Sequence, residues 1–351
     1  MEAVIDVDKI RENAAKVRSM AAGKELTLML KADAYNHGAD VVAVATQEFA
    51  DAFGVAVPEE ARRLKAVHGF THGITVYSPL PREIPAVVAE GFVPVIYSAE
   101  CLEALRYSGG AEVDIKFDTG MGRLGFKGEE GVREAAFAAR RSRLKIGKLL
   151  THLPSAASAS ECVALFNDYK RVFEEAFGES FPAEYSASDA LIEGLSGDGY
   201  RIGRLLYEGA MKIYSEVLAV SFLKKGEHAG YDGVYTAPDD IAVAVLQGGY
   251  YDGVRRDFRG GKVMFNNRMM TIAAVCMDVT IVAGAPAELR QGDKVCLFDG
   301  GIDAGDANIY EQWTSFKGRT ERKYLLHGKI LTEENCLGAL RPCFRQGRGI
   351  A

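Results

Sequence analysis

Short apolar runs alternate with segments of helical periodicity along the first half of the chain. Runs rich in Val, Ile, Leu and Phe predict strands at residues 26–30, 53–57, 73–77, 93–97, 113–117 and 146–150. Charged and apolar residues at helical spacing predict helices at residues 58–67, 98–107, 129–141 and 159–177. Another helix is predicted at residues 8–21, where the apolar residues from Ile10 to Ala21 share one face and Asp8 is the expected N-cap.

This alternation indicates a parallel sheet whose strands are connected by helices. Repeated strand–helix units over this length suit a (β/α)8 barrel of the TIM type, which usually needs about 250 residues. A doubly wound sheet is the alternative, but no G-x-G-x-x-G motif follows the first predicted strand. The pattern therefore predicts an α/β fold that begins with a TIM-type barrel.

The pattern changes near residue 210. Apolar segments rich in β-branched residues follow one another, separated by Gly, Asn and Asp, which is typical of antiparallel strands and turns. Asn266 and Asn267 are placed to form a two-residue hairpin turn. We therefore expect a barrel at residues 1–210 and a C-terminal mainly-β domain at residues 211–351.

Composition excludes several classes of function. The 351 residues carry a net charge of −6, which argues against nucleic acid as a partner. The six cysteines show no C-x-x-C pair and no zinc-like cluster with histidine, so we expect reduced thiols and no metal. The N-terminus lacks the apolar core of a signal peptide, and no apolar run approaches the ~18 residues of a membrane helix. A soluble, cytoplasmic protein is expected.

Lys31 is the first candidate for chemistry, because it directly follows the predicted strand at residues 26–30. In a barrel, catalytic groups lie at the carboxyl ends of the strands. Burial lowers the pKa of a lysine, and the neutral amine can then form an imine with a carbonyl compound. A lysine that reaches solvent from the barrel rim would give the same pattern, so the position alone leaves both interpretations open.

The sequence around Lys31 adds a resemblance. Residues 31–38, "KADAYNHG", are similar to the "K-A-N-A-Y-G-H-G" signature of alanine racemases, in which that lysine carries pyridoxal 5'-phosphate (PLP). Six further segments resemble sequence blocks of the family and follow one another in the family's order. They are residues 114–126, 149–156, 200–209, 229–237, 248–256 and 274–279. The resemblance covers essentially the whole chain. It implies a fold-type III, PLP-dependent isomerase that interconverts L- and D-alanine and supplies D-alanine for peptidoglycan.

The resemblance also implies which residues move protons. Racemisation removes the α-proton on one face of the substrate and returns one on the other, which requires two bases. Lys31 matches the first base of the family and Tyr231 the second. A phenol has an ordinary pKa of about 10 and is a poor base near neutral pH, so its anion needs support. His152 matches the histidine that supports it in the family.

Arg201 matches the family's arginine that faces the ring nitrogen of PLP. Most PLP enzymes place a carboxylate there, which keeps the nitrogen protonated and makes the ring a strong electron sink. An arginine cannot accept a proton, so the resemblance implies a weaker sink that favours reprotonation of the substrate over transamination.

Four other residues match the positions that bind the phosphate of PLP in the family: Tyr35, Ser188, and the backbones of Gly203 and Arg204. Backbone N–H groups at the start of a helix suit an anion of this kind. Ser186 is an alternative to Ser188, because residues 184–191, "EYSASDAL", align only loosely with the family's serine-containing segment.

The resemblance implies a carboxylate site as well. Arg123 matches the arginine that holds the substrate carboxylate, and Lys116 the lysine that is often carbamylated to orient that arginine. Met277 and Tyr250 match substrate-site residues that, like Tyr231, lie in the predicted β domain. In the family the two halves of each site come from different subunits, so a homodimer with shared sites is implied.

The chain departs from the family at several positions. Asn36 and Asp232 each replace a glycine, and asparagine tolerates the left-handed backbone region. Ile202 replaces a proline, and Ala274 stands where an arginine is common. Aligned on Cys336, Leu340 occupies the position of a tyrosine that contacts the PLP phosphate in many members. The lost hydrogen bond is worth about 1.5–3 kcal/mol if its partner is charged.

The Leu340 position leaves two substrates open, because losing a tyrosine can open space beside the substrate's β-carbon. We expect alanine, with serine or another small amino acid as the alternative. Two other functions were weighed: a PLP barrel enzyme of another reaction class, such as a decarboxylase or a D-amino-acid lyase, and a weakly active PLP-binding homologue. The tyrosine block around Tyr231 and the arginine at Arg201 argue against the first.

Overall fold

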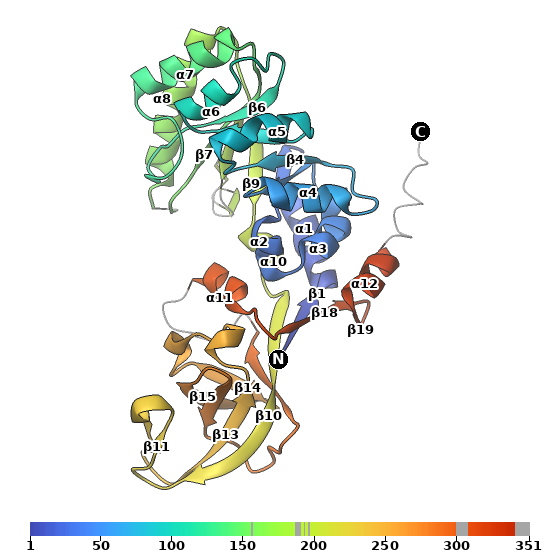
Figure 1. Ribbon diagram of the computed structural model, residues 1–351, viewed down its shortest axis with the longest axis vertical. Coiled ribbons are helices and arrows are strands. Elements are labelled where there is room, and N and C mark those ends of the chain that lie inside the picture. The colour runs from blue at the N-terminus through green and yellow to red at the C-terminus, as the bar shows by residue number, and fades with distance from the viewer. Residues whose placement is uncertain (156, 187–190, 193, 196, 300–307, 341–351) are drawn as a thin grey trace. The chain divides into compact units, whose positions relative to one another are not determined.

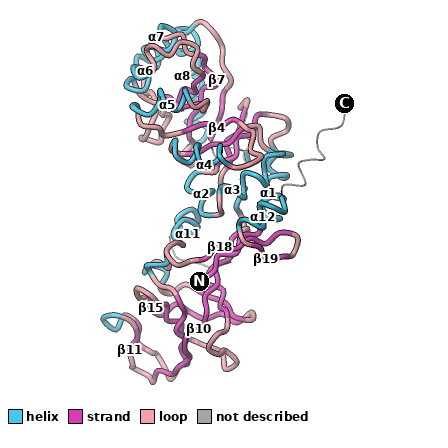
Figure 2. The backbone as a smooth tube through the Cα atoms, turned by 45° about the vertical axis from the view of Figure 1, so that its right-hand side comes forward, coloured by secondary structure: helices cyan, strands magenta, loops and turns pink. Residues whose placement is uncertain are grey.

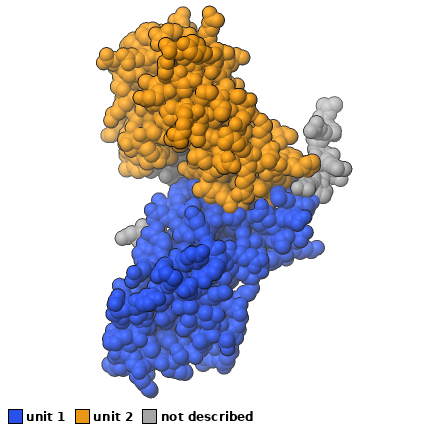
Figure 3. Space-filling view, in the orientation of Figure 1, with its two compact units in different colours: residues 1–10, 35–37, 207–351 blue, residues 11–34, 38–206 orange. Residues whose placement is uncertain are grey.

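The computed structural model describes residues 1–155, 157–186, 191–192, 194–195, 197–299 and 308–340. By its internal contacts the chain divides into two compact units, shown in Figure 3. Unit 1 contains residues 1–10, 35–37 and 207–351, and unit 2 contains residues 11–34 and 38–206.

Unit 2 is a closed barrel of parallel strands, so the predicted TIM-type barrel is confirmed and the doubly wound alternative is wrong. In order around the barrel, the strands are β2 Glu25–Met29, β3 Ala52–Val55, β4 Gly73–Val76, β5 Val93–Ile96, β6 Glu112–Lys116, β7 Lys145–His152, β8 Ala183–Ser186 and β9 Gly199–Ile202. The barrel closes where β9 pairs with β2.

Helices cover the outside of this barrel (Figure 1). They are α3 Ala39–Thr46, α4 Pro58–Ala66, α5 Ile84–Ala89, α6 Ala99–Ala104, α7 Glu129–Arg141, α8 Ala159–Phe177 and α10 Arg204–Tyr207. Apolar side chains of α7 and α8 pack on the outward-facing residues of β6 and β7, with Phe117, Phe166 and Phe173 at the centre of this core. The predicted helices at 58–67, 98–107, 129–141 and 159–177 are therefore confirmed in place.

Unit 1 is built on a nine-stranded, mainly antiparallel sheet (Figure 2). Its strands, in spatial order, are β13 Ile241–Gln247, β16 Val279–Ala283, β15 Arg268–Val275, β14 Lys262–Phe265, β17 Lys294–Phe298, β10 Met211–Leu223, β1 Glu2–Asp6, β18 Glu321–Leu326 and β19 Lys329–Leu331. A small sheet of β11 His228–Ala229 and β12 Tyr235–Thr236 and the helices α11 Ile309–Ser315 and α12 Glu333–Leu340 complete the unit. The Asn266-Asn267 turn joins β14 to β15, and both asparagines have positive φ, as predicted.

The N-terminal helix α1 Val7–Met20 differs from its prediction in one detail. Asp8 was expected to cap it, but Asp6 does so: its Oδ1 accepts a hydrogen bond from the backbone N–H of Lys9 at 2.9 Å. Asp8 lies in the first turn, and its carboxylate instead accepts from the backbone N–H of His327. The reason is that the strand β1 runs directly into the helix, so the last strand residue takes the cap position.

Two further findings concern the part of the chain that the structure describes. None of its helices combines the length and apolar character that crossing a membrane requires. Within the same residues, no group of three or more His, Cys, Asp or Glu side chains is arranged to hold a metal ion.

Candidate active site

Lys31 begins a short helical turn, α2 Lys31–Asn36, immediately after β2. The five residues that follow it, Ala32 to Asn36, all have φ between 51° and 69°, so this turn is left-handed. Side chains crowd the backbone in that conformation at a cost of about 1–2 kcal/mol per residue. Glu60 offsets part of this cost, because its Oε1 accepts from the backbone N–H of Ala32 at 2.7 Å. A strained segment held in this way is typical of a functional site.

Asn36, which replaces the family's glycine, ends this turn at φ 69°. Its side-chain amide donates to the backbone oxygens of Trp313, at 2.9 Å, and Phe316, at 2.6 Å. Its Oδ1 accepts from Nη2 of Arg322 at 3.0 Å. The asparagine therefore tolerates the left-handed conformation, as predicted, and also ties the end of the turn to α11 and β18 within unit 1.

Tyr35 lies in an aromatic cluster of unit 1. Its ring centroid is 5.2 Å from those of both Tyr207 and Tyr310, and its side chain is buried. His37 and Trp313 extend the cluster, with ring centroids 5.4 Å apart. This packing holds the Tyr35 ring in place.

The loop after β6 carries Arg123. Asp118 shapes this loop, because its carboxylate accepts from the backbone N–H groups of Gly120, Gly122 and Arg123 at 3.2, 3.0 and 3.0 Å. The loop then returns to the strand: Phe126 donates from its backbone N–H to the oxygen of Lys116 at 2.9 Å. The D-T-G-M-G-R block thus fixes where Arg123 leaves the backbone, close to Lys116.

Five cationic or titratable side chains of unit 2 act on one another near the carboxyl ends of the strands. Burial, with Arg201 and Arg123 nearby, lowers the pKa of Lys31. The same three causes lower the pKa of Lys116 to about 7 and that of His152 to about 3. Lys31, Lys116 and His152 are thus biased toward their neutral forms. Lys116 and Arg201 are buried, Lys31 and His152 are partly buried and Arg123 is exposed. A cluster of this kind suits an anionic ligand, because an anion would offset the mutual repulsion.

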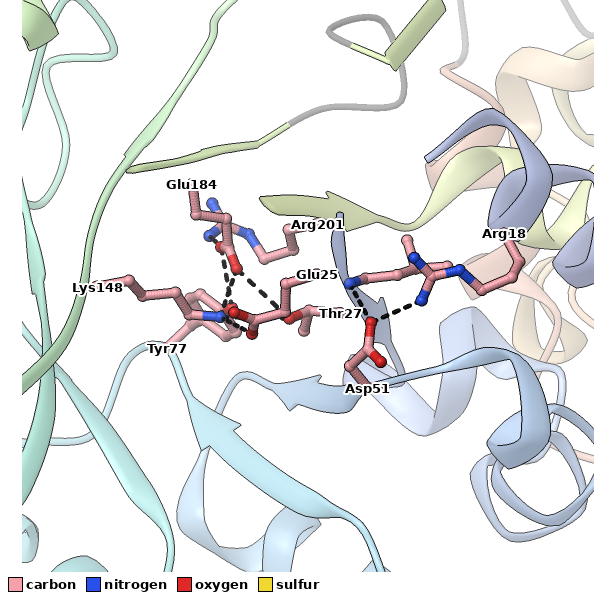
Figure 4. Close-up of polar contacts among 9 residues, drawn as sticks. Arg18, Glu25, Thr27, Asp51, Tyr77, Lys148, Glu184 and Arg201 are labelled. Atoms are coloured by element: carbon pink, nitrogen blue, oxygen red, sulfur yellow. Dashed lines mark hydrogen bonds and ion pairs between the residues drawn. The ribbon is translucent and has the colours of Figure 1, made fainter. Parts of the chain in front are cut away.

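Arg201, on β9, is itself buried at 6% exposure. Its Nη1 donates to Glu184 Oε1 on β8 at 2.5 Å (Figure 4). Its Nη2 donates to the backbone oxygen of Thr151 at 3.3 Å. The guanidinium carbon lies 4.4 Å from the centroid of the Tyr77 ring, within the range of a cation–π contact. Glu184 also forms an ion pair with Lys148 of β7 at 2.7 Å.

The tyrosine block of unit 1 forms an exposed 3-10 turn, Tyr231–Gly233. Gly230 is required before it, because a Cβ there would lie 2.5 Å from the Cβ of Ala274. Asp232, which replaces a glycine of the family, has φ 56°. Tyr231 is 57% exposed and borders a cavity of about 300 Å³ that Arg256 and Arg259 also line.

Two neighbouring loops of unit 1 carry Tyr250 and Met277. The backbone N–H of Tyr250 donates to Cys276 O at 2.9 Å, and that of Tyr251 donates to Met277 O at 3.2 Å. The side chains of Tyr250 and Met277 are 38% and 46% exposed. The structure therefore presents Tyr231, Tyr250 and Met277 at the surface of unit 1.

A charged clamp fastens these two loops. Asp252 accepts from Nε and Nη2 of Arg319 at 2.9 and 2.7 Å, and from the backbone N–H of Gly249 at 3.2 Å. The same Nη2 donates to Asp278 Oδ1 at 2.9 Å. Arg319 therefore bridges the loop of Tyr250 and the loop of Met277.

Comparison with known proteins gives the site its context. The chain matches the model of the alanine racemase N-terminal domain over residues 5–210 and that of the alanine racemase C-terminal domain over residues 210–324. The chain belongs to the alanine racemase family. Members of this family are PLP-dependent isomerases.

Relatives and solved structures agree with this assignment. Alanine racemase 1 of Bacillus subtilis is 29% identical over 373 residues, covering 95% of both chains. The biosynthetic alanine racemase of Escherichia coli is 29% identical, covering 92% of this chain and 98% of its own. The Streptomyces coelicolor alanine racemase structure has a TM-score of 0.85 at 23% identity, covering 92% of this chain and 97% of its own. The Bartonella henselae alanine racemase structure, solved with covalently bound pyridoxal phosphate, has a TM-score of 0.81 at 24% identity, covering 92% and 99%.

The residues of unit 2 fit the family's cofactor chemically. PLP brings an aldehyde and a phosphate, and Lys31 is a partly buried amine whose pKa is lowered, among cations that favour an anion. Gly203 and Arg204 lie where β9 passes into α10. Ser188, the predicted phosphate ligand, lies outside the described residues. Leu340 ends α12 and is buried at 3% exposure.

Sequence reasoning missed the charged residues behind Arg201. Glu184, Lys148 and Tyr77 contact Arg201 or one another inside the barrel, yet the resemblance assigns a role to none of them; Glu184 only begins the loosely aligned block at residues 184–191. The available signal was charge in a strand: Lys148 interrupts the apolar segment at 146–150, where a barrel normally places aliphatic residues. Asp252 and Arg319 were missed as well, since they act through loops.

Proposed function

We propose that this protein is a PLP-dependent racemase that interconverts L- and D-alanine. The observation that carries the proposal is Lys31, a partly buried lysine with a lowered pKa at the end of β2, in a chain of the alanine racemase family. Partial burial beside Arg201 and Arg123 disfavours a lysine that must stay charged. It suits a lysine that would attach a carbonyl cofactor, because the neutral amine is the species that reacts.

In this proposal Lys31 would hold the cofactor covalently, Arg201 would face its ring nitrogen, and Tyr35 and the backbones of Gly203 and Arg204 would bind its phosphate. When bound, PLP withdraws electrons from the substrate's α-carbon and makes the α-proton acidic. Ser188 is retained as a further phosphate ligand. The Bartonella henselae relative, solved with covalently bound pyridoxal phosphate, supports this choice of cofactor.

Two residues move the proton in this mechanism. On one face of the substrate Lys31 accepts a proton as the amine or donates one as the ammonium, and on the other face Tyr231 accepts as the phenolate or donates as the phenol. His152 supports Tyr231 by hydrogen bonding, and it does so as a neutral ring, because burial and the nearby cations lower its pKa to about 3. A cationic His152 would add to the repulsion around Arg201.

Arg123 holds the substrate carboxylate, aided by the Met277 backbone and by Tyr250. Lys116 is proposed to be carbamylated: its neutral amine adds to carbon dioxide and releases one proton, which leaves an anionic carbamate. The lowering of the Lys116 pKa to about 7 supports this, because a neutral amine is the species that reacts. The carbamate would orient Arg123 by a charge-assisted hydrogen bond.

The second base is proposed to come from a partner subunit in a homodimer. Tyr231, Tyr250 and Met277 are all exposed on unit 1 of the single chain, which supports a surface that meets another copy. The proposed role of the enzyme is to supply D-alanine for peptidoglycan in the cytoplasm, in line with the name of the biosynthetic E. coli relative.

The test is to purify the protein with PLP and supply L-alanine and L-serine separately while following the D-enantiomers. We expect D-alanine to form. Lys31→Ala should abolish the visible absorbance of the lysine-bound cofactor, whereas Tyr231→Phe should keep it and slow removal of the proton from the L-isomer by about 100-fold or more. No D-amino acid from a protein with intact cofactor absorbance would refute the racemase proposal, and full activity in Tyr231→Phe would refute the assignment of the second base.

Serine is the second candidate substrate, for one reason. Leu340 carries no hydroxyl and lies where a tyrosine narrows the pocket in many members. A comparison of kcat/KM for the two amino acids in the wild type and in Leu340→Tyr measures this effect. A higher kcat/KM for L-serine than for L-alanine, reversed in Leu340→Tyr, would assign serine as the substrate.

A further inference from the structure

The Arg201 guanidinium is enclosed on several sides by groups that the family resemblance does not assign. Glu184 accepts its Nη1, the backbone oxygen of Thr151 accepts its Nη2, and the face of Tyr77 lies 4.4 Å from its carbon. Three strand ends therefore define where the guanidinium can lie. Of these partners only Glu184 carries a charge, so it makes the strongest contact.

Several contacts fix the position of the Glu184 carboxylate. Besides Arg201, its Oε1 accepts from the Tyr77 hydroxyl at 3.4 Å, and its Oε2 lies 2.7 Å from Lys148 Nζ and 3.4 Å from Thr27 Oγ1. Burial would raise the pKa of Glu184, but Lys148 and Arg201 outweigh it and the net shift is downward. The carboxylate is therefore ionised and bridges two cations.

Lys148 is fixed from the other side. Its Nζ also pairs with Glu25 Oε1 at 2.6 Å, and its side chain is 8% exposed. Burial would lower the pKa of Lys148, but Glu184 and the other nearby acids raise it well above the usual range. The chain Glu25–Lys148–Glu184–Arg201, visible in Figure 4, thus alternates in charge from the exposed Glu25 into the barrel interior.

The register of the strands places this chain on one side of Arg201. Glu184 pairs with Gly199, two residues before Arg201 on β9, whereas Lys31 follows the carboxyl end of β2. Glu184 is therefore nearer the amino ends of the strands than Arg201 is. From there it can hold the guanidinium and offset its charge without occupying the position that faces the cofactor.

We propose that Glu184, itself held by Lys148, is a positioning residue that orients the Arg201 guanidinium toward the cofactor ring. The inference rests on the proposed function for what Arg201 faces, and on the observed contacts for what holds it. Among the described residues, the guanidinium without Glu184 would keep the neutral backbone acceptor of Thr151 and the contact with Tyr77, and its uncompensated charge would act more strongly on Lys31 and Lys116.

The first test measures the guanidinium directly, in wild-type holoprotein labelled with ¹³C,¹⁵N-arginine. An arginine held by a bidentate or buried contact rotates slowly about its Cζ–Nε bond and gives separate Nη signals, whereas a solvated arginine gives one averaged signal. Arg201→Lys assigns the resonance. We expect separate Nη signals for Arg201, and an averaged signal in the wild type would overturn the inference whether or not any variant folds.

The second test uses Glu184→Gln with Asp114→Asn as the matched control. Both variants convert one buried barrel carboxylate to an amide, and Asp114 has no hydrogen bond to Arg201 among the described contacts. We expect Glu184→Gln to average the Arg201 Nη signals, to shift the pH titration of the bound cofactor's visible absorbance, and to lower kcat by ~10- to 100-fold with little change in KM. Asp114→Asn should leave the Arg201 signals and that titration as in the wild type.

These readouts separate the two proposals. If the wild type forms no D-amino acid but Glu184→Gln still releases the Arg201 guanidinium, the proposed function fails and the positioning role stands. If the wild type is an active racemase and Glu184→Gln keeps separate Nη signals and an unchanged cofactor titration, the positioning role fails and the function stands. A return of the slow-rotating signal in Glu184→Asp would support the requirement for a carboxylate.

Discussion

Each unit contains a charged network beside candidate site residues of that unit, and the two networks differ mainly in their exposure to water. In the barrel, the side chains of Glu184, Arg201 and Lys148 are 1%, 6% and 8% exposed. In unit 1, Asp252 is 2% exposed, but its partner Arg319 is 55% exposed and Asp278 is 62% exposed.

This difference determines how strongly each network constrains its neighbours. Water cannot replace a lost partner in the barrel, so a buried ion whose partner is removed carries its full desolvation cost. Around Arg319, water and salt can take over part of each contact. The barrel network is therefore a rigid support for Arg201, and the Arg319 clamp is a weaker link between two loops.

The largest effect is expected from Lys148→Met. The substitution keeps the length of the side chain but leaves the Glu184 carboxylate without one of its two cations. Breaking a buried pair on one side typically costs about 3–5 kcal/mol. Urea denaturation of the holoprotein measures the free energy of unfolding. The matched control is Lys224→Met, whose pair with Asp240 is exposed, and it should cause no measurable change. Equal effects of the two substitutions would refute the comparison.

The second prediction concerns Asp114, which is 2% exposed at the amino-terminal side of the barrel interior. Burial raises its pKa from 3.8 to about 7, opposed by Lys148 and reinforced by Glu184, Glu25 and Glu112. Because the folded pKa is the higher one, the neutral carboxyl contributes stability that is complete below about pH 3.8 and is lost as the pH rises to about 7.

Asp114→Asn removes this titration while keeping the shape of the side chain. The free energy of unfolding of the wild type minus that of Asp114→Asn should therefore fall between about pH 4 and pH 7 and then stay level. The opposite trend from His152, whose pKa is lowered, is present in both proteins and cancels in the difference. Denaturation curves across this range provide the measurement, and a difference independent of pH would show that Asp114 titrates normally.

The ionic interior also explains which parts of the fold could be predicted from the sequence. The apolar strands at 26–30, 53–57 and 93–97 were predicted near their observed places because they form part of the barrel's apolar packing. The strands β8 and β9 were missed, since Glu184 and Arg201 point into an interior that normally holds Val, Ile and Leu, and no apolar run results. The charged residues in these two segments mark the ionic interior, but charged residues in a sequence normally indicate a solvent-exposed segment.

The strand β1 was missed for another reason. It is five residues long, and its partners β10 and β18 lie about 200 and 320 residues away, so no local pattern marks it. The division at residue 210 stays a prediction, as do the roles of Lys31, Tyr231 and the other matched residues. Family blocks locate such residues, but they do not report how the residues are held.

The smallest effects are expected in unit 1, where two aspartates share one arginine. Asp252→Asn should lower the free energy of unfolding by about 1–3 kcal/mol, since Asp252 is buried and accepts charge-assisted bonds from Arg319. Asp278→Asn removes the exposed half of the clamp and should have no measurable effect on unfolding. Both would be measured by urea denaturation at low and at about 0.5 M salt, where screening should reduce the effect of Asp252→Asn far less than that of any exposed pair. If Asp278→Asn proved as damaging as Asp252→Asn, exposure would not be what separates the two networks, and the contrast with the barrel would have to be explained by geometry instead.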